Sequence, residues 1–286
     1  MASLKEIKGR IASVQSTLKI TSAMKMVSSA KLHKVQGAAL SFAEYESRVS
    51  AMVATLRSAT EVCSPLVVPH TAAKRAVLVA LASDTSLCGG FNASAIKTAT
   101  EAVARLRAEG FECVEVVAIG EKMVAAMSKS GVEMCREFPT SIGDYDYEQV
   151  ARLTEWLIDE YTSERVDRVE VAYHHFHSMG RQVPTADRLL PVAVERFEVD
   201  AKVADADYIF EPSAEELMSN LVPYAVKIQM YEILLDNTTS EHAARTVAMQ
   251  TASDNANDLL DELRLTYNKR RQQAITDELA DITSHE

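Results

Sequence analysis

The chain has 286 residues, of which 47% are hydrophobic, and its formal net charge is −11. We expect a folded protein without direct bilayer insertion, because no run of about twenty apolar residues is present. The acidic balance also argues against nucleic acid as a partner, since phosphate binding needs a coherent basic surface. The N-terminus has no apolar core of a signal peptide.

The first 64 residues contain no proline and predict one long helix. Ser3-Leu4-Lys5-Glu6 has the pattern of a capping box, which marks the start of a helix. Apolar residues then recur with a period of about 3.5, the seam of a coiled coil. The seam residues are Leu4, Ile7, Ile11, Val14, Leu18, Leu32, Val35, Ala39, Phe42, Val49, Val53 and Leu56. Polar residues at other seam positions are Thr21, Lys25, Ser28 and Glu46. The break at 21–28 is either tolerated in one seam or marks a change of pairing surface.

The middle of the chain alternates between two periodicities. Continuous apolar runs predict buried strands at residues 75–83, 113–119 and 169–177. Helical patterns predict helices at residues 93–108, 121–129 and 147–163. Residues 179–192, which contain two prolines, are predicted to form a loop, and residues 193–199 an edge strand. This alternation is typical of an inserted Rossmann-like α/β domain.

A second capping box, Ser213-Ala214-Glu215-Glu216, predicts the start of a C-terminal helix. The residues after Pro223 would span about 95 Å as one helix, whereas a globule of this chain length is only about 50 Å across. We expect Pro223 to kink the helix and the polar residues 237–242 to make it irregular. Apolar steps predict a seam at Leu260, Leu263, Tyr267, Ile275, Leu279 and Ile282.

Opposite charge favours pairing of the two terminal helices. Residues 1–60 carry nine Lys and Arg against three Glu, whereas residues 213–286 carry six basic and thirteen acidic residues. A basic and an acidic helix at opposite ends suit an antiparallel coiled coil; two separate solvated helices are the alternative. The predicted domains are a coiled-coil helix at 1–64, an α/β domain at 65–212 and a coiled-coil helix at 213–286.

No motif for catalysis or cofactor binding accompanies this fold. The turn at residues 84–92, DTSLCGGFN, has neither GxGxxG nor GxxxxGK[ST]. Ser86 and Cys88 lack the GxSxG context of a nucleophile, and Asp84 or Asn92 is expected to cap the following helix. The four cysteines form no CxxC pair, and we expect them to be reduced.

Histidines gather only at residues 174–177, where His175 and His177 would share one face of a strand and His174 the other. Two imidazoles could bind a metal weakly, but no carboxylate is close in sequence. An exposed strand face is the preferred interpretation. We therefore expect no catalytic, cofactor-binding or metal-binding residue.

Five segments resemble the gamma subunit of F-type ATP synthase, in its bacterial form. They are residues 20–32 (ITSAMKMVSSAKL), 83–92 (SDTSLCGGFN), 240–245 (SEHAAR), 254–256 (DNA) and 267–279 (YNKRRQQAITDEL). They follow the family's order along nearly the whole chain. Gln273 departs from the alanine that is usual there, which loosens the contact inferred beside it.

The resemblance implies a non-catalytic central shaft. In that family the coiled coil stands in a hexamer of three alpha and three beta subunits, one copy per complex, and the lower part meets the epsilon subunit and the c-ring. Rotation driven by proton flow then passes to the catalytic sites, and the subunit also regulates ATPase activity and proton flow. The implied location is peripheral, on the cytoplasmic face of the bacterial inner membrane. The residues carried over as partner contacts are Met24, Lys25, Arg271, Gln272, Thr276 and Glu278.

Two other classes of function stay open on the residues alone. One is an α/β hydrolase or nucleotide-binding protein with a helical dimerisation arm, which would bind a small molecule. The other is a structural coiled-coil adaptor, which would form a stable homodimer through its helices.

Overall fold

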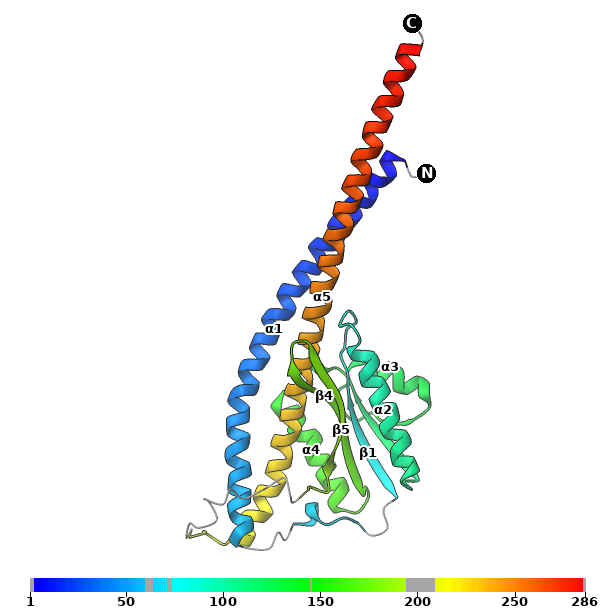
Figure 1. Cartoon of the computed structure of the whole chain (residues 1–286). Coiled ribbons are helices and arrows are strands. Elements are labelled where there is room, and N and C mark those ends of the chain that lie inside the picture. Colours follow the sequence, from blue (N-terminus) through cyan, green and yellow to red (C-terminus); the bar gives the residue numbers. More distant parts are fainter. Residues whose placement is uncertain (1–2, 60–63, 71–73, 145, 194–208, 285–286) are drawn as a thin grey trace. The chain divides into compact units, whose positions relative to one another are not determined.

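The computed structural model describes residues 3–59, 64–70, 74–144, 146–193 and 209–284; for 58–59, 144, 278 and 281–284 it describes the backbone alone. The chain forms two compact units. The helix-pair unit comprises residues 1–31 and 245–286, and the sheet unit comprises residues 32–244. Two long helices, α1 (Leu4–Ala59) and α5 (Ala214–Ser284), contribute to both units (Figure 1).

Both predicted capping boxes begin helices. The amide of Glu6 donates to Ser3 Oγ at 3.2 Å, and the amide of Glu216 donates to Ser213 Oγ at 3.2 Å. Each serine thereby satisfies an amide that the first helical turn leaves unpaired. Helix α5 continues through Pro223. It is also regular across residues 237–242, so the predicted irregularity there is wrong.

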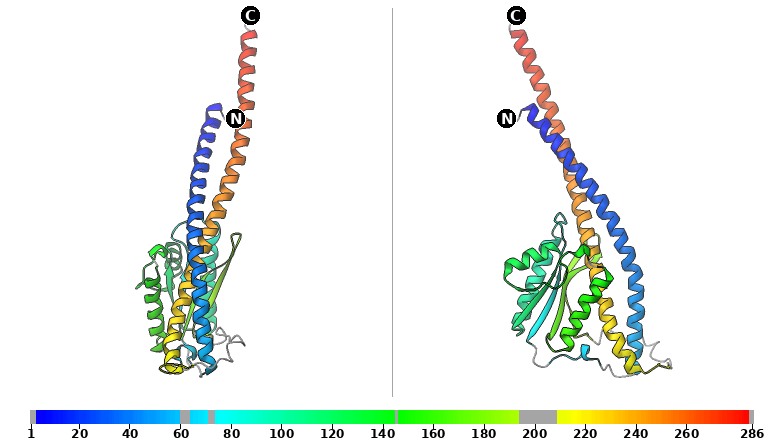
Figure 2. Two further views of the ribbon diagram at one scale, coloured as in Figure 1. Left: turned by 90° about the vertical axis from the view of Figure 1, so that its left-hand side faces the viewer. Right: turned by 180° about the vertical axis from the view of Figure 1, so that it is seen from behind.

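In the helix-pair unit, α1 and α5 run antiparallel (Figure 2). Thr21 Oγ1 lies 2.8 Å from Ser253 Oγ, and both residues are buried. Counting outward from this contact in an antiparallel pair places Leu260 level with Val14 and Tyr267 level with Ile7. Those positions are buried or half-buried, as the seam predicts. At Thr21 the polar break therefore lies within the seam, where the hydroxyl groups of the two helices hydrogen-bond to each other.

The sheet unit contains five strands in the order β3-β2-β1-β4-β5. The first four are parallel, and β5 pairs antiparallel with β4. The strands are β1 (Arg75–Leu81), β2 (Cys113–Ile119), β3 (Glu133–Cys135), β4 (Arg168–Ser178) and β5 (Arg181–Leu190). The shorter helices are α2 (Phe91–Ala108), α3 (Glu121–Ser130) and α4 (Tyr147–Thr162), with 3-10 turns at Pro65–Val67 and Ile142–Asp144. The parallel part has the strand order of a Rossmann fold.

Alternate residues of the central strand enter two separate cores. Val77 and Val79 pack in the core formed with α4 and with parts of α1 and α5. Leu78 and Ala80 pack in the core formed with α2 and α3. Because helices cover both faces, the strand is apolar at every position after Arg75, which explains its continuous apolar run.

The last strand corrects the sequence prediction. Residues 179–192 were expected to form a loop, but most of them form β5. Pro184 lies opposite His174, whose amide and carbonyl hydrogen-bond to α5 rather than to β5. At such a non-hydrogen-bonded pair the missing N–H of proline removes no ladder bond, and β5 is an edge strand. Ala193 is not in a strand, and the rest of the edge strand predicted at 193–199 lies outside the described residues.

Candidate functional site

The residues expected to contact a partner all belong to the helix-pair unit. Met24 and Lys25 are half-buried on α1, whereas Arg271, Gln272 and Thr276 are exposed on α5. Glu278 is described by its backbone alone. The antiparallel register separates the α1 pair from the α5 group by roughly 30 Å along the axis. The residues expected to contact a partner therefore lie at two separate levels of the helix pair.

The basic cluster Lys269-Arg270-Arg271 precedes a stretch of α5 whose apolar residues are exposed. The register brings Leu4, the first residue of α1, level with about residue 270 of α5. Beyond it, Ile275 is 49% exposed and Leu279 57% exposed. The prediction that these two residues continue a buried seam is therefore wrong, because α1 ends before reaching them.

Polar side chains of the turn after β1 hydrogen-bond within the turn and to neighbouring segments. Asn92 Oδ1 accepts from Ser83 N at 3.0 Å and from Ser83 Oγ at 2.9 Å. Asp84 Oδ1 accepts from the amide of Glu121 at 3.2 Å, at the first residue of α3. Neither side chain caps α2, contrary to the prediction. Asn92 is thus engaged within the turn, whereas Asp84 fastens the turn to α3 and to residues 141–143.

His174 is held by structural partners. His174 is 1% exposed, stacks on Phe91 with ring centroids 4.2 Å apart, and has Nε2 2.8 Å from Ser94 Oγ. His175 and His177 are exposed on β4, which confirms the interpretation of an exposed strand face, whereas His174 on the opposite face is buried. Within the described residues, no group of three His, Cys, Asp or Glu side chains could hold a metal ion.

Burial lowers the pKa of His174 to about 4. The unfolded chain, with an ordinary histidine pKa of about 6.5, then binds more protons between these values. We expect stability to fall as the pH drops from about 6.5 towards 4, by up to about 3 kcal/mol. Denaturant unfolding at several pH values across this range gives the free energy of unfolding as a function of pH. This free energy should depend less steeply on pH for His174→Gln than for the unchanged chain. An equal dependence in both would contradict the lowered pKa of His174.

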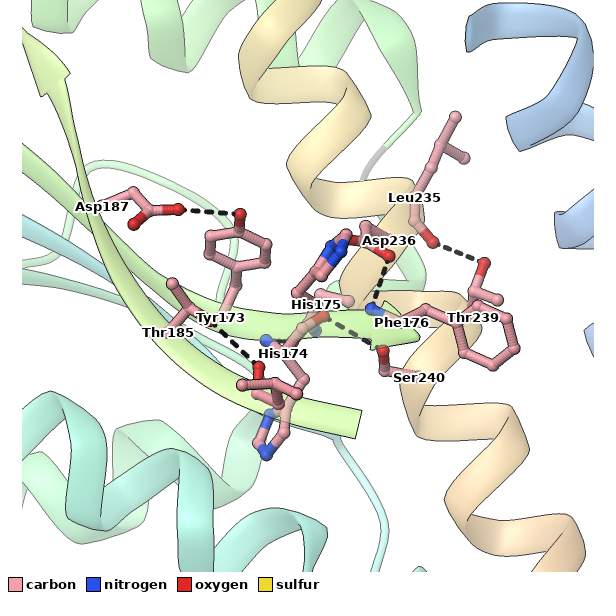
Figure 3. Close-up of polar contacts among 12 residues, drawn as sticks. Tyr173, His174, His175, Phe176, Thr185, Asp187, Leu235, Asp236, Thr239 and Ser240 are labelled. Atoms are coloured by element: carbon pink, nitrogen blue, oxygen red, sulfur yellow. Dashed lines mark hydrogen bonds and ion pairs between the residues drawn. The ribbon is translucent and has the colours of Figure 1, made fainter. Parts of the chain in front are cut away.

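Side chains of α5 hydrogen-bond to the backbone edge of β4 that β1 leaves unpaired (Figure 3). We call this group of contacts the junction. Pairing between β1 and β4 ends at Ala172. Beyond it, the amide of His174 donates to Asn237 Oδ1 at 3.1 Å, and Ser240 Oγ donates to the carbonyl of His174 at 3.1 Å. The amide of Phe176 donates to Asp236 Oδ1 at 2.8 Å. The helix thus satisfies strand groups that β1 no longer reaches.

Two polar residues of the junction, Asn237 and Ser240, belong to the segment 237–242 that the sequence predicted to disturb the helix, and Asp236 immediately precedes it. The only signal for their role was a short polar stretch within an otherwise apolar segment. Their function is to fasten α5 to the sheet within the sheet unit, with Asp236 Oδ2 also 2.6 Å from His175 Nδ1. The junction is a mechanical attachment and holds no arrangement for bond chemistry.

Asn237→Leu should weaken this attachment. The substitution removes the acceptor of the His174 amide inside the protein, which costs about 1–3 kcal/mol. Amide hydrogen exchange should become faster at His174 and along residues 173–176. Asn255→Leu, at an exposed position on the same helix, is the matched control and should leave this exchange unchanged.

No helix within the described ranges is both long enough and apolar enough to cross a membrane. The chain matches the family model described as ATP synthase over residues 3–285. It is 43% identical to the ATP synthase gamma chain of Bacteroides thetaiotaomicron, covering 99% of this chain and 98% of that one. It is 46% identical to the gamma chain of Phocaeicola vulgatus, with the same coverage.

Solved structures share the fold. A chain of the central stalk and c-ring of the Tetrahymena thermophila mitochondrial ATP synthase has a TM-score of 0.56 at 22% identity, covering 82% of this chain and 99% of that one. A chain of the Euglena gracilis mitochondrial ATP synthase has a TM-score of 0.58 at 16% identity, and the match covers 98% of this chain and 92% of that one. The full-length match to the family model and to bacterial relatives above 40% identity shows that this chain belongs to the ATP synthase gamma chain family.

Proposed function

We propose that this chain is the central shaft of an F-type ATP synthase and transmits rotation between a c-ring and a hexamer of three alpha and three beta subunits. The observation that carries the proposal is the antiparallel helix pair, with α5 continuous over 71 residues. A long helix braced by a second helix resists bending and twisting better than a loop-linked chain. Membership of the gamma chain family supports the same role.

The junction supplies a route for torque within the sheet unit. Force applied to the sheet would reach α5 through the hydrogen bonds of Asp236, Asn237 and Ser240 to β4. The apolar core that α4 and the sheet share with α5 adds area to this attachment. We infer that the sheet unit meets the epsilon subunit and the c-ring, and that the complex is peripheral on the cytoplasmic face of the bacterial inner membrane.

We further propose that Arg271, Gln272, Thr276 and Glu278 contact a loop of a catalytic subunit, and that Met24 and Lys25 form a second contact. Exposure of Arg271, Gln272 and Thr276 supports the first contact. The half-burial of Met24 and Lys25 leaves part of each side chain available to a partner.

Co-purification from native membranes tests the function. The chain should be recovered in a multi-subunit ATPase with one copy per three catalytic subunits. The purified chain alone should neither bind nor hydrolyse ATP, because the turn after β1 lacks a phosphate loop. Recovery outside such a complex, together with micromolar ATP binding by calorimetry, would instead support the nucleotide-binding alternative.

A further inference from the structure

The tip of the β4–β5 hairpin carries three side chains of types that bind metals. His175, His177 and Met179 alternate along the end of β4 and into the turn before β5, in the pattern H-x-H-x-M. All three are exposed. Two histidines alone would bind a metal weakly, and the thioether of Met179 adds a third donor. The partner contacts proposed above lie in the helix-pair unit and use none of these residues.

The two histidines lie on one face of β4. Successive residues of a strand point to opposite faces, and the intervening residues agree, since His174 is buried and Phe176 is half-buried. Residues two apart on a strand are about 7 Å apart, so both imidazoles can reach one ion between them. The register of β4 and β5 shifts between Phe176 and Ser178, and no residue of β5 is paired with His177. Within the described residues His177 makes no hydrogen bond or ion pair that a metal would have to displace.

Asp236 prepares His175 as a ligand. Its Oδ2 lies 2.6 Å from His175 Nδ1 (Figure 3). Beside a carboxylate Nδ1 keeps its proton and donates, which leaves the lone pair of the neutral ring on Nε2. This side chain is 58% exposed, and its Nε2 has no partner among the described residues. A histidine that binds a metal almost always donates its other ring N–H in this way, which fixes the ring and raises its basicity.

The turn that carries Met179 is held in place by hydrogen bonds. Gln182 Nε2 donates to the carbonyl of Ser178 at 3.0 Å and to the carbonyl of Met179 at 2.8 Å. These bonds fasten both turn carbonyls to β5. The thioether therefore extends from a fixed backbone directly after the two histidines.

We propose that the hairpin tip binds one Cu(I) ion through His175 Nε2, a ring nitrogen of His177 and Met179 Sδ. Within the described residues, no third His, Cys, Asp or Glu side chain joins the two histidines, so the thioether decides which metal is bound. A thioether is a soft ligand that selects Cu(I), and imidazole also suits copper. All three donors are uncharged, and the exposed Arg181 follows the turn. A monovalent ion is therefore repelled less than a divalent one.

Titration of the reduced full chain with Cu(I), in the absence of oxygen, tests the site. The Cu(I) concentration is buffered with bathocuproine disulfonate, and methionines labelled with ¹³C in their methyl groups are followed by NMR. The Met179 signal, assigned through Met179→Leu, should shift and saturate. The four cysteines also bind Cu(I), but the Met179 signal reports the hairpin alone.

Matched variants test which side chains hold the ion. His177→Gln should weaken the binding seen at Met179 about tenfold or more, because a ligand is lost. His33→Gln replaces another exposed histidine, on α1, and should leave this binding unchanged. Asp236→Asn should weaken it about tenfold, because a carboxylate no longer orients His175.

Three results would overturn the proposal. They are the absence of a saturable shift at Met179, an equal shift at Met26, which is 70% exposed on α1, and equal weakening by His177→Gln and His33→Gln. An equally strong shift with Zn(II) would overturn the assignment to copper, and unchanged binding in Asp236→Asn would overturn the role of that carboxylate. Because these tests need only the chain, their failure is separate from any failure to recover the proposed complex.

Discussion

Leu260→Asp is expected to melt the helix pair at a lower temperature while the sheet unit largely survives. Leu260 is 3% exposed, so the substitution removes an apolar side chain from the seam and places a carboxylate there. The combined loss is about 3–5 kcal/mol, which corresponds to a decrease in melting temperature of roughly 10 °C or more. Leu263→Asp should act in the same direction, and less strongly, because Leu263 is only half-buried.

The chain offers matched controls and two separate reporters for this experiment. Leu259 is 44% exposed and Leu265 is 73% exposed, so Leu259→Asp and Leu265→Asp make the same chemical change outside the seam. Far-ultraviolet circular dichroism follows the helices. Trp156, the only tryptophan, packs on Phe138 in the sheet unit with ring centroids 5.2 Å apart, and its fluorescence follows that unit. Equal melting of the Leu260 and Leu259 variants would show that Leu260 does not face the partner helix.

Arg271→Ala combined with Gln272→Ala is expected to leave the fold intact and to reduce ATP hydrolysis or coupled ion pumping about tenfold or more in the reconstituted complex. Both side chains are exposed, so their removal disturbs no core. A charged hydrogen bond to a catalytic subunit is worth about 1.5–3 kcal/mol, which is sufficient for this change in rate. Favourable interaction with the dipole at the helix C-terminus is a weak alternative, since α5 continues to Ser284.

A neighbouring double variant separates a specific contact from general loss of charge. Lys269→Ala combined with Gln273→Ala also removes one basic residue and one glutamine, from neighbouring exposed positions of α5. It should retain most of the turnover and pumping. Normal assembly, full turnover and full pumping in the Arg271 and Gln272 variant would show that this contact is dispensable.

The alternation of strands and helices could be predicted because burial on both sides of a strand leaves a continuous apolar run. β2 was predicted with the bounds that it has, and β1 and β4 within two residues at each end. The short strand β3 was missed because three residues carry too little pattern. The edge strand β5 was missed because Pro184 reads as a loop signal unless its hydrogen-bonding position is known.

The sequence by itself determined the two long helices, their capping residues, their seam as far as Tyr267 and the absence of a phosphate loop. Each of these depends on spacing within one segment, and local geometry converts that spacing into a helical face or a turn. Only the tertiary structure decided the uses of Asp236 and Asn237. Both satisfy the backbone of a strand about sixty residues earlier in the chain. A polar side chain on a helix has the same local preference in water or at a junction, so its partner is known only when the chain has folded around it.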